Sequence, residues 1–262
     1  MRTLAVGDVC GSIGVKMLAR VLPRIRREKN IDFVIVNGEN SADGNGITQE
    51  SAEALFLAGA DVITGGNHSF RRKEVYSMLE SHPFLLCPNN IPSEYGKGYC
   101  LFDMGRTVLA VINLSGKIYL DLLKAENPFY AADSLVERAK SEGATHIFVD
   151  FHAEATSEKR ALGLYLDGKI TAFFGTHTHV QTADLQILEK GTGYITDLGM
   201  TGPINSVLGV ESSIIINRLK DGDATKFTLA EGKCMLCGCI FESDSSGRTV
   251  GTELVCIKEG EA

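Results

Sequence analysis

Seven side chains suited to holding metal ions occur in short clusters along this 262-residue chain. They comprise two carboxylates, two amides and three histidines: Asp8, Glu39, Asn40, Asn67, His152, His177 and His179. Imidazole nitrogen combined with carboxylate and amide oxygen is a mixed donor set that suits Mn, Fe or Zn. Seven ligands are too many for one tetrahedral ion and enough for two ions that share a carboxylate. We therefore predict a site for two divalent metal ions.

Taken singly, these residues say little, because a lone histidine such as His152 is more often a hydrogen-bonded structural residue. Asp8 or Glu39 alone could equally cap a helix. Their placement is more informative, since each cluster directly follows an apolar run typical of a buried strand. The five runs span residues 4–6, 32–37, 61–64, 146–150 and 170–174. Ligands of open α/β sheets bind where strands end at their carboxyl edge, so we expect the five clusters to meet there.

A dinuclear site of this composition predicts phosphoester hydrolysis. Two ions ~3.5–4 Å apart lower the pKa of a shared water and clamp a phosphoryl group for in-line attack by the bridging hydroxide. Two divalent ions carry four positive charges. Asp8 and Glu39 neutralise about two of these, which leaves about +2 for the hydroxide and an anionic substrate. His68 adjoins Asn67 and is the candidate to protonate the leaving oxygen or to stabilise charge on the phosphate. The alternative for His68 is a loop histidine bonded to the backbone.

Strand and helix patterns alternate through the first two-thirds of the chain. Residues 13–25 place apolar side chains on one helical face, and further helices are expected at 49–57, 72–79, 127–140 and 158–166. A strand is also expected at 108–113, and from residue 184 short strands and turns predominate. We find no repeat and no linker, so we predict an α/β fold in a single domain, residues 1–262.

Composition narrows the partners and the compartment. A net charge of −7 argues against binding extended nucleic acid, which needs a basic face. No apolar run is long enough to cross a bilayer, and the N-terminus lacks a signal-peptide pattern. Seven cysteines, an odd number, indicate a reducing, cytoplasmic setting. Cys234, Cys237 and Cys239 suggest a zinc or iron–sulfur site, but strand alternation favours ordinary cysteines on opposite faces.

The clusters, in order, resemble the calcineurin-like metallophosphoesterase superfamily. The motifs G-D, G-E-N, G-N-H, F-H-A-E and G-T-H-T-H carry this resemblance. Within the superfamily, residues 37–40, 149–159, 175–182 and 197–203 are similar to the YmdB-type bacterial cyclic-nucleotide phosphodiesterase family. The pattern departs from the wider superfamily at Cys10, where a histidine is usual, and at Glu39, where the usual bridging residue is aspartate. The resemblance covers residues 1 to about 215.

The resemblance implies a two-sheet β-sandwich flanked by helices, the αββα architecture. It assigns Asp8, Glu39, Asn40 and His179 to one metal ion. It assigns Glu39, Asn67, His152 and His177 to the other, with Glu39 as the bridge. It further implies His68 as the proton donor, iron or manganese as the metals with zinc as a further candidate, and a homo-oligomer.

We therefore predict a metal-dependent phosphodiesterase that hydrolyses small nucleotides, with cyclic nucleotides favoured. One alternative is another phosphoesterase of the superfamily, that is, a nucleotidase, protein phosphatase or nuclease. The other is a regulatory scaffold that keeps the metals but acts through protein partners. A diester is favoured over a monoester because no arginine lies in the five motifs to balance a dianion. Arg71, Arg72 and Lys159 are the nearest cations that could reach in.

Overall fold

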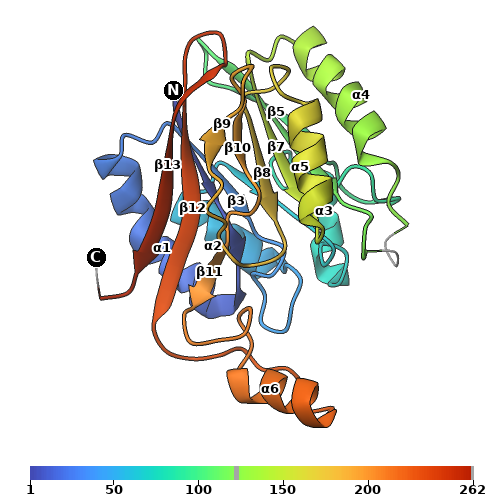
Figure 1. The fold of residues 1–262 in the computed structure, drawn as a ribbon, viewed down its shortest axis with the longest axis vertical. Helices are drawn as coiled ribbons and strands as arrows, with labels where there is room; N and C mark the ends of the chain where they lie inside the picture. The colour runs from blue at the N-terminus through green and yellow to red at the C-terminus, as the bar shows by residue number, and fades with distance from the viewer. Residues whose placement is uncertain (121–123, 261–262) are drawn as a thin grey trace.

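Two β-sheets stack face to face in the computed structural model, which describes residues 1–120 and 124–260 (Figure 1). Within these ranges the first sheet is 7-stranded, in the order β2-β11-β12-β1-β3-β4, with β13 paired to β12. Its strands are β1 (Arg2–Val6), β2 (Asp8–Val9), β3 (Phe33–Asn37), β4 (Val62–Thr64), β11 (Met200–Pro203), β12 (Cys234–Ser243) and β13 (Thr249–Lys258). β1, β3 and β4 run parallel, and β12 joins β1 antiparallel.

The second sheet is 6-stranded within the described ranges, in the order β5-β6-β7-β8-β10-β9. Its strands are β5 (Tyr99–Asp103), β6 (Val108–Ser115), β7 (His146–His152), β8 (Ala172–Thr176), β9 (Gln186–Ile187) and β10 (Gly193–Ile195). The central strands β6, β7, β8 and β10 are parallel, and antiparallel β5 and β9 form the two edges.

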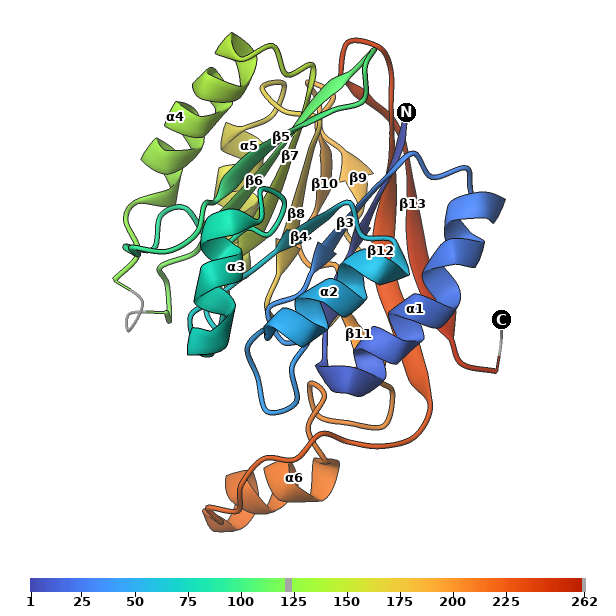
Figure 2. The same ribbon diagram turned by 180° about the vertical axis from the view of Figure 1, so that it is seen from behind.

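Helices cover the outer face of each sheet (Figure 2). α1 (Gly11–Glu28) and α2 (Gln49–Ala58) pack on the first sheet, and α4 (Pro128–Ser141) and α5 (Thr156–Tyr165) on the second. A 3₁₀ turn (Lys73–Val75) leads into α3 (Tyr76–Ser81). α4 begins as its sequence predicts, with Pro128 in the first turn and the Asn127 side chain accepting from Phe129 N–H. This arrangement confirms the two-sheet sandwich flanked by helices.

Alternation along the strands divides the apolar side chains into three core layers. Leu4 and Val6 face the helices α1 and α2, whereas Ala5 between them faces the other sheet. On β6, Leu109 and Val111 point between the sheets and join the same central cluster as Ala5. Because both sheets contribute to this central cluster, we infer that the described residues form one domain.

A buried carboxylate joins the two sheets at their carboxyl edge. Asp150, on β7, is fully buried and accepts hydrogen bonds from Asn37 on β3 at 3.0 Å and from Thr64 on β4. It also accepts from Thr176 on β8 at 2.7 Å. Its environment raises the pKa of Asp150 to about 6, chiefly through burial. The hydrogen bonds therefore supply the compensation that a buried carboxylate needs.

A second polar link crosses the sandwich beside the first. Asn113, on β6 of the second sheet, accepts from Gly65 N–H at 2.8 Å and donates to Gly65 C=O at 3.1 Å. Gly65 directly follows β4 of the first sheet, so both of its backbone polar groups are held by the other sheet. The segment that follows, Gly66 to His68, leaves the sheet from a position set by this contact.

The last third of the chain departs from the expected mostly-β pattern at α6 (Ser212–Asp221). This helix contains the β-branched run Ile214 to Ile216, which favours strands locally. Gly222 in the left-handed conformation ends it. α6 has no buried residue and lies apart from the sandwich in both ribbon views (Figures 1 and 2). In the described part of the chain, none of the helices is long and apolar enough to cross a membrane.

The cysteines of β12 lie on opposite faces, as alternation predicts. Cys234 belongs to the cluster under α1, and Cys239 to the cluster between the sheets. Cys237 lies with its Sγ 3.9 Å from that of Cys256 on β13. All seven cysteines are free thiols, and the side chains of Cys234 and Cys239 are separated by the sheet. This arrangement argues against the zinc alternative.

Asp150→Ala is expected to lower the free energy of unfolding by about 2–4 kcal/mol, because two hydroxyls and one amide in the core each lose an acceptor. The measurement is urea unfolding with a chelator present, so that metal binding does not contribute to stability. The exposed Asp221→Ala serves as the control and should stay within about 0.5 kcal/mol of the parent. A loss below about 1 kcal/mol for Asp150→Ala would show that the cross-sheet contact matters little.

Candidate metal centre

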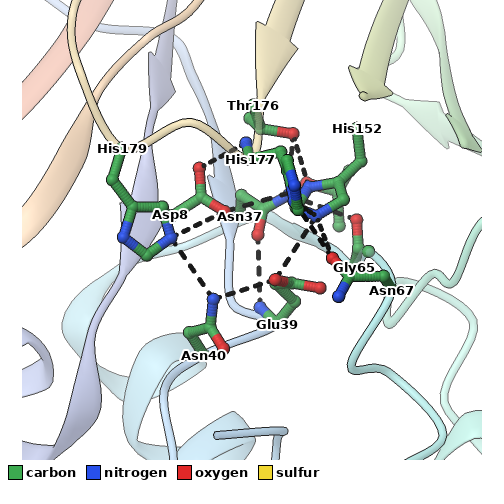
Figure 3. A network of polar contacts seen from close by, with 12 residues as sticks. Asp8, Asn37, Glu39, Asn40, Gly65, Asn67, His152, Thr176, His177 and His179 are labelled. Atoms are coloured by element: carbon green, nitrogen blue, oxygen red, sulfur yellow. Dashed lines mark hydrogen bonds and ion pairs between the residues drawn. The ribbon is translucent and has the colours of Figure 1, made fainter. Parts of the chain in front are cut away.

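All seven predicted ligands meet at the carboxyl edge of the two sheets (Figure 3). Asp8 lies in β2, and the segments after β3 and β4 bring Glu39, Asn40 and Asn67. The second sheet supplies His152 at the end of β7, and the turn after β8 supplies His177 and His179. Asp8, Glu39 and His152 are buried, and the other four are half-buried. The structure therefore brings together every residue that the sequence pattern grouped.

One half of the cluster gathers atoms that carry lone pairs. His152 Nε2 lies 3.0 Å from His177 Nδ1, and the two nitrogens are 2.8 and 3.1 Å from Asn67 Oδ1. Glu39 Oε1 lies 3.3 Å from His152 Nε2. A single proton cannot satisfy two nitrogens and two oxygens that face one another. A cation at this point satisfies all four, and Glu39, His152 and His177 already have the spacing of metal ligands.

The other half of the cluster contains two buried oxygens without partners. His179 Nε2 lies 3.8 Å from Asp8 Oδ1 and 3.4 Å from Asn40 Nδ2. Asp8 Oδ1 and Asn40 Oδ1 are buried and accept no hydrogen bond. Burying such oxygens unpaired costs free energy unless a donor or a cation faces them. The donor set of both halves therefore fits divalent ions, and Glu39, which also accepts from Asn40 Nδ2 at 2.8 Å, stands between the halves.

The turn that carries two of the histidines is strained and firmly held. His177 and His179 have φ angles of 102° and 62°, in the left-handed region that residues with a Cβ rarely adopt. Thr178 N–H between them donates to Asp197 at 3.1 Å, and Asp197 in turn pairs with Lys159 at 2.7 Å. Both members of this ion pair are fully buried. The pair thus fixes the backbone of the turn through Thr178 N–H.

Further contacts orient the histidine rings. His152 Nδ1 lies 2.9 Å from Thr176 Oγ1, which itself donates to Asp150. His177 Nε2 lies 3.0 Å from Glu154 Oε2. In each ring the contact engages one nitrogen and leaves the other free for a metal ion. The sequence pattern did not single out Thr176 or Glu154 for these roles. Glu154 could have been found from the sequence, because it lies in the same F-H-A-E motif as His152.

Electrostatics act on the donors in different directions, and nearby Cys10, Asp8 and Glu39 outweigh burial to raise the pKa of His179 to about 10. Burial and the nearby charge of His152 lower the pKa of His177 to about 3, so its ring is neutral. Burial raises the pKa of Asp8. At Glu39 burial acts in the same direction, but His152 and His68 outweigh it and hold the pKa well below its usual range. Glu39 is therefore ionised at neutral pH.

His68 lies beside the ligands and is open to the cavity. Its backbone N–H donates to Glu39 Oε2 at 2.9 Å, and its Nδ1 lies 3.1 Å from Glu39 Oε1. Nε2 lies 3.2 Å from Asn67 Nδ2. A quarter of the side chain is exposed. The ring is thus held between a carboxylate and an amide.

The cluster forms one side of a cavity of about 400 Å³. Among the residues described by the structure, no lysine or arginine lines this cavity. Lys159, expected from its position in sequence to be able to reach in, is instead buried in its pair with Asp197. Arg72 donates to the backbone oxygens of Asp43 and Asn45. The half-exposed carboxylate of Glu154 adds a negative charge to the lining.

Known proteins share this fold and much of this sequence. A protein of Bacillus subtilis (strain 168) named 2′,3′-cyclic-nucleotide 2′-phosphodiesterase is 44% identical over 99% of this chain and 98% of its own length. The crystal structure of a novel phosphatase from Mycoplasma pneumoniae superposes with a TM-score of 0.93 at 33% identity, covering 98% of this chain and 93% of the other. A 5′-nucleotidase precursor of Thermus thermophilus has a TM-score of 0.60 at 11% identity, covering 98% and 54%, and shares the fold alone.

Fold and site together define a metallophosphoesterase, a metal-dependent hydrolase of phosphoesters. A family described as YmdB-like protein matches residues 4–255, nearly the whole chain. The chain belongs to this YmdB-like family. The metallophosphoesterase class and the YmdB-like family match both confirm the resemblance that the motifs indicated.

Glu39→Ala is expected to remove both metal ions, because Glu39 stands between the two halves of the cluster. Asn67→Ala should weaken mainly the ion beside His152 and His177, since Asn67 contacts only that half. Elemental analysis of the purified variants measures the metal content, with the exposed Glu137→Ala as a control that retains both ions. Two full equivalents of metal in Glu39→Ala would refute the bridging role.

Proposed function

We propose that this chain hydrolyses 2′,3′-cyclic nucleotides at a dinuclear metal centre. Asp8, Glu39, Asn40 and His179 would hold one ion, and Glu39, Asn67, His152 and His177 the other. The observation that carries the proposal is the convergence of lone pairs within 3.1 Å at Asn67 Oδ1, together with the unpartnered Asp8 Oδ1, which lies 3.8 Å from His179 Nε2. The substrate class is supported by the Bacillus subtilis relative, which bears the name of that activity.

The chain's own residues position the substrate and supply the leaving-group proton. When bound, divalent ions supply Lewis acidity toward phosphoryl oxygens and lower the pKa of water. His68 lines the same cavity as Glu39, His177 and His179, so the leaving oxygen of a bound substrate would come within reach of the His68 ring. Glu39 contacts His68 Nδ1 and orients the ring, which would donate the proton to this oxygen. Water is excluded from the far side, where Asp8 and His152 are fully buried.

Three finer properties belong to the same proposal. The mixed nitrogen and oxygen donors suit iron or manganese, with zinc as a further candidate. The free thiols at all seven cysteines accord with a reducing, cytoplasmic compartment. A homo-oligomer is proposed from the family resemblance, and the exposed Leu219 and Ile216 of α6 offer apolar contact area.

His68→Gln is expected to slow hydrolysis of adenosine 2′,3′-cyclic phosphate by about 10²-fold, because the ribose oxygen must be protonated as it leaves. Hydrolysis of bis(p-nitrophenyl) phosphate should fall much less, since p-nitrophenolate leaves without a proton. Metal content should persist, because His68 is not among the ligands. His82→Gln is the matched control, a histidine stacked on Phe56. Equal losses for both substrates would indicate that His68 positions the phosphate instead.

The cavity should prefer diesters over monoesters. Two divalent ions less Asp8, Glu39 and one hydroxide would leave about +1, which a singly charged diester neutralises and a monoester with nearly two negative charges exceeds. With Glu154 in the lining and no cation from the described residues, a dianion is the poorer fit. We expect kcat/KM for adenosine 2′,3′-cyclic phosphate to exceed that for adenosine 2′-monophosphate by about tenfold or more.

Glu154→Gln removes one negative charge from the cavity lining. It should lower the ratio of kcat/KM for the diester to kcat/KM for the monoester, even where both values fall. Glu50→Gln, at the exposed start of α2, is the control and should leave the ratio unchanged. Equal or greater kcat/KM for the monoester in the parent protein would contradict the charge argument.

A further inference from the structure

An apolar wall faces the metal-ligand cluster across the cavity. It is formed by the segment that leaves the sandwich after β11 and returns before β12 (Figure 2). Its lining side chains are Val207, Leu208, Val210, Ile215, Phe227 and Leu229. The cavity thus has a polar side that fits phosphate and an apolar side for which the hydrolytic chemistry has no use.

The wall is joined directly to the catalytic side. His179 Nδ1 lies 3.2 Å from Leu208 C=O, and Gly209 packs against Cys10. Backbone bonds from Glu211 N–H to Thr228 C=O and from Ala230 N–H to Gly209 C=O close the two ends of the segment on each other. A group bound to the metal-ligand cluster therefore lies beside a wall whose position is set by one of those ligands.

Phe227 contributes a benzene ring to this wall and is 41% exposed. The Arg218 guanidinium lies 4.2 Å from the ring centroid, and it donates to the backbone oxygens of Asp223 and Thr225. Arg218 thus covers one side of the ring and holds it without a surrounding core. The exposed remainder of the ring is available to a flat partner.

We propose that the apolar wall is a nucleobase subsite and that Phe227 is the ring on which the base stacks. This inference rests on the proposed function, because a cyclic nucleotide joins a phosphodiester and a base through one ribose. A cavity of about 400 Å³ is of the size that holds one small ligand. Stacking on an aromatic ring tolerates any base, since every base has a π-face. The subsite would therefore confer selectivity for nucleotides over other phosphodiesters without selecting one base.

The test compares two substrates with the same cyclic phosphate, adenosine 2′,3′-cyclic phosphate and methyl riboside 2,3-cyclic phosphate, which lacks a base. Phe227→Ala should raise KM for the adenosine substrate about tenfold and leave kcat within about twofold. For the base-free substrate, kcat/KM should stay within about twofold. Phe227→Tyr, which keeps the ring, should retain the parent KM. Leu219→Ala, on the same segment and 83% exposed, is the control.

Equal changes for both substrates in Phe227→Ala, or no change for either, would overturn the subsite. Saturation-transfer NMR with adenosine, which has no phosphate, separates this outcome from failure of the proposed function. Transfer to the adenine protons in the parent protein and its loss in Phe227→Ala support the subsite even if no cyclic nucleotide is hydrolysed. Absence of transfer in the parent protein overturns the subsite even if cyclic nucleotides are hydrolysed.

Discussion

The buried carboxylate of Asp150 is the contact on which the geometry of this protein depends. It accepts from Asn37 and Thr64 of one sheet and from Thr176 of the other. Thr176 passes the constraint on to His152 through its hydroxyl. Because Asp150 has no lysine or arginine partner among the described residues, its ionised form is stable only while all three donors face it. The two carboxyl edges are thereby held in a common register, and the predicted metal ligands extend from them.

Local strain and unpaired polar groups concentrate around this edge. Two histidines adopt positive φ angles, and oxygens of Asp8 and Asn40 are buried without hydrogen bonds. Such features lower stability unless the surroundings hold them in place. Here the Lys159–Asp197 pair holds the histidine turn, and bound cations would compensate the oxygens. Stability given up at the site is offset by three apolar layers on and between the sheets.

The segment that contains α6 is held in place differently from the two sheets. It has few buried contacts and is positioned by backbone bonds at its base and by Arg218 over Phe227. A helix of 10 residues is marginal by itself in water. The edge that carries the predicted ligands thus faces a wall that is joined to it at His179 and otherwise has few buried contacts.

The sequence alone predicted most of the strands and which polar residues converge at the carboxyl edge, because each polar cluster follows an apolar run and strand residues alternate with period two. The motifs also indicated the family, and the capping residues placed the start of α4. The tertiary structure decided three further things. It placed the five strand ends on two sheets rather than one, through Asp150 and Asn113. It buried Lys159 away from the cavity, since its partner Asp197 lies 38 residues further along the chain. It made a helix of the isoleucine-rich α6 and turned Phe227 toward the ligands. These outcomes depend on contacts between distant residues, which local pattern and spacing do not encode.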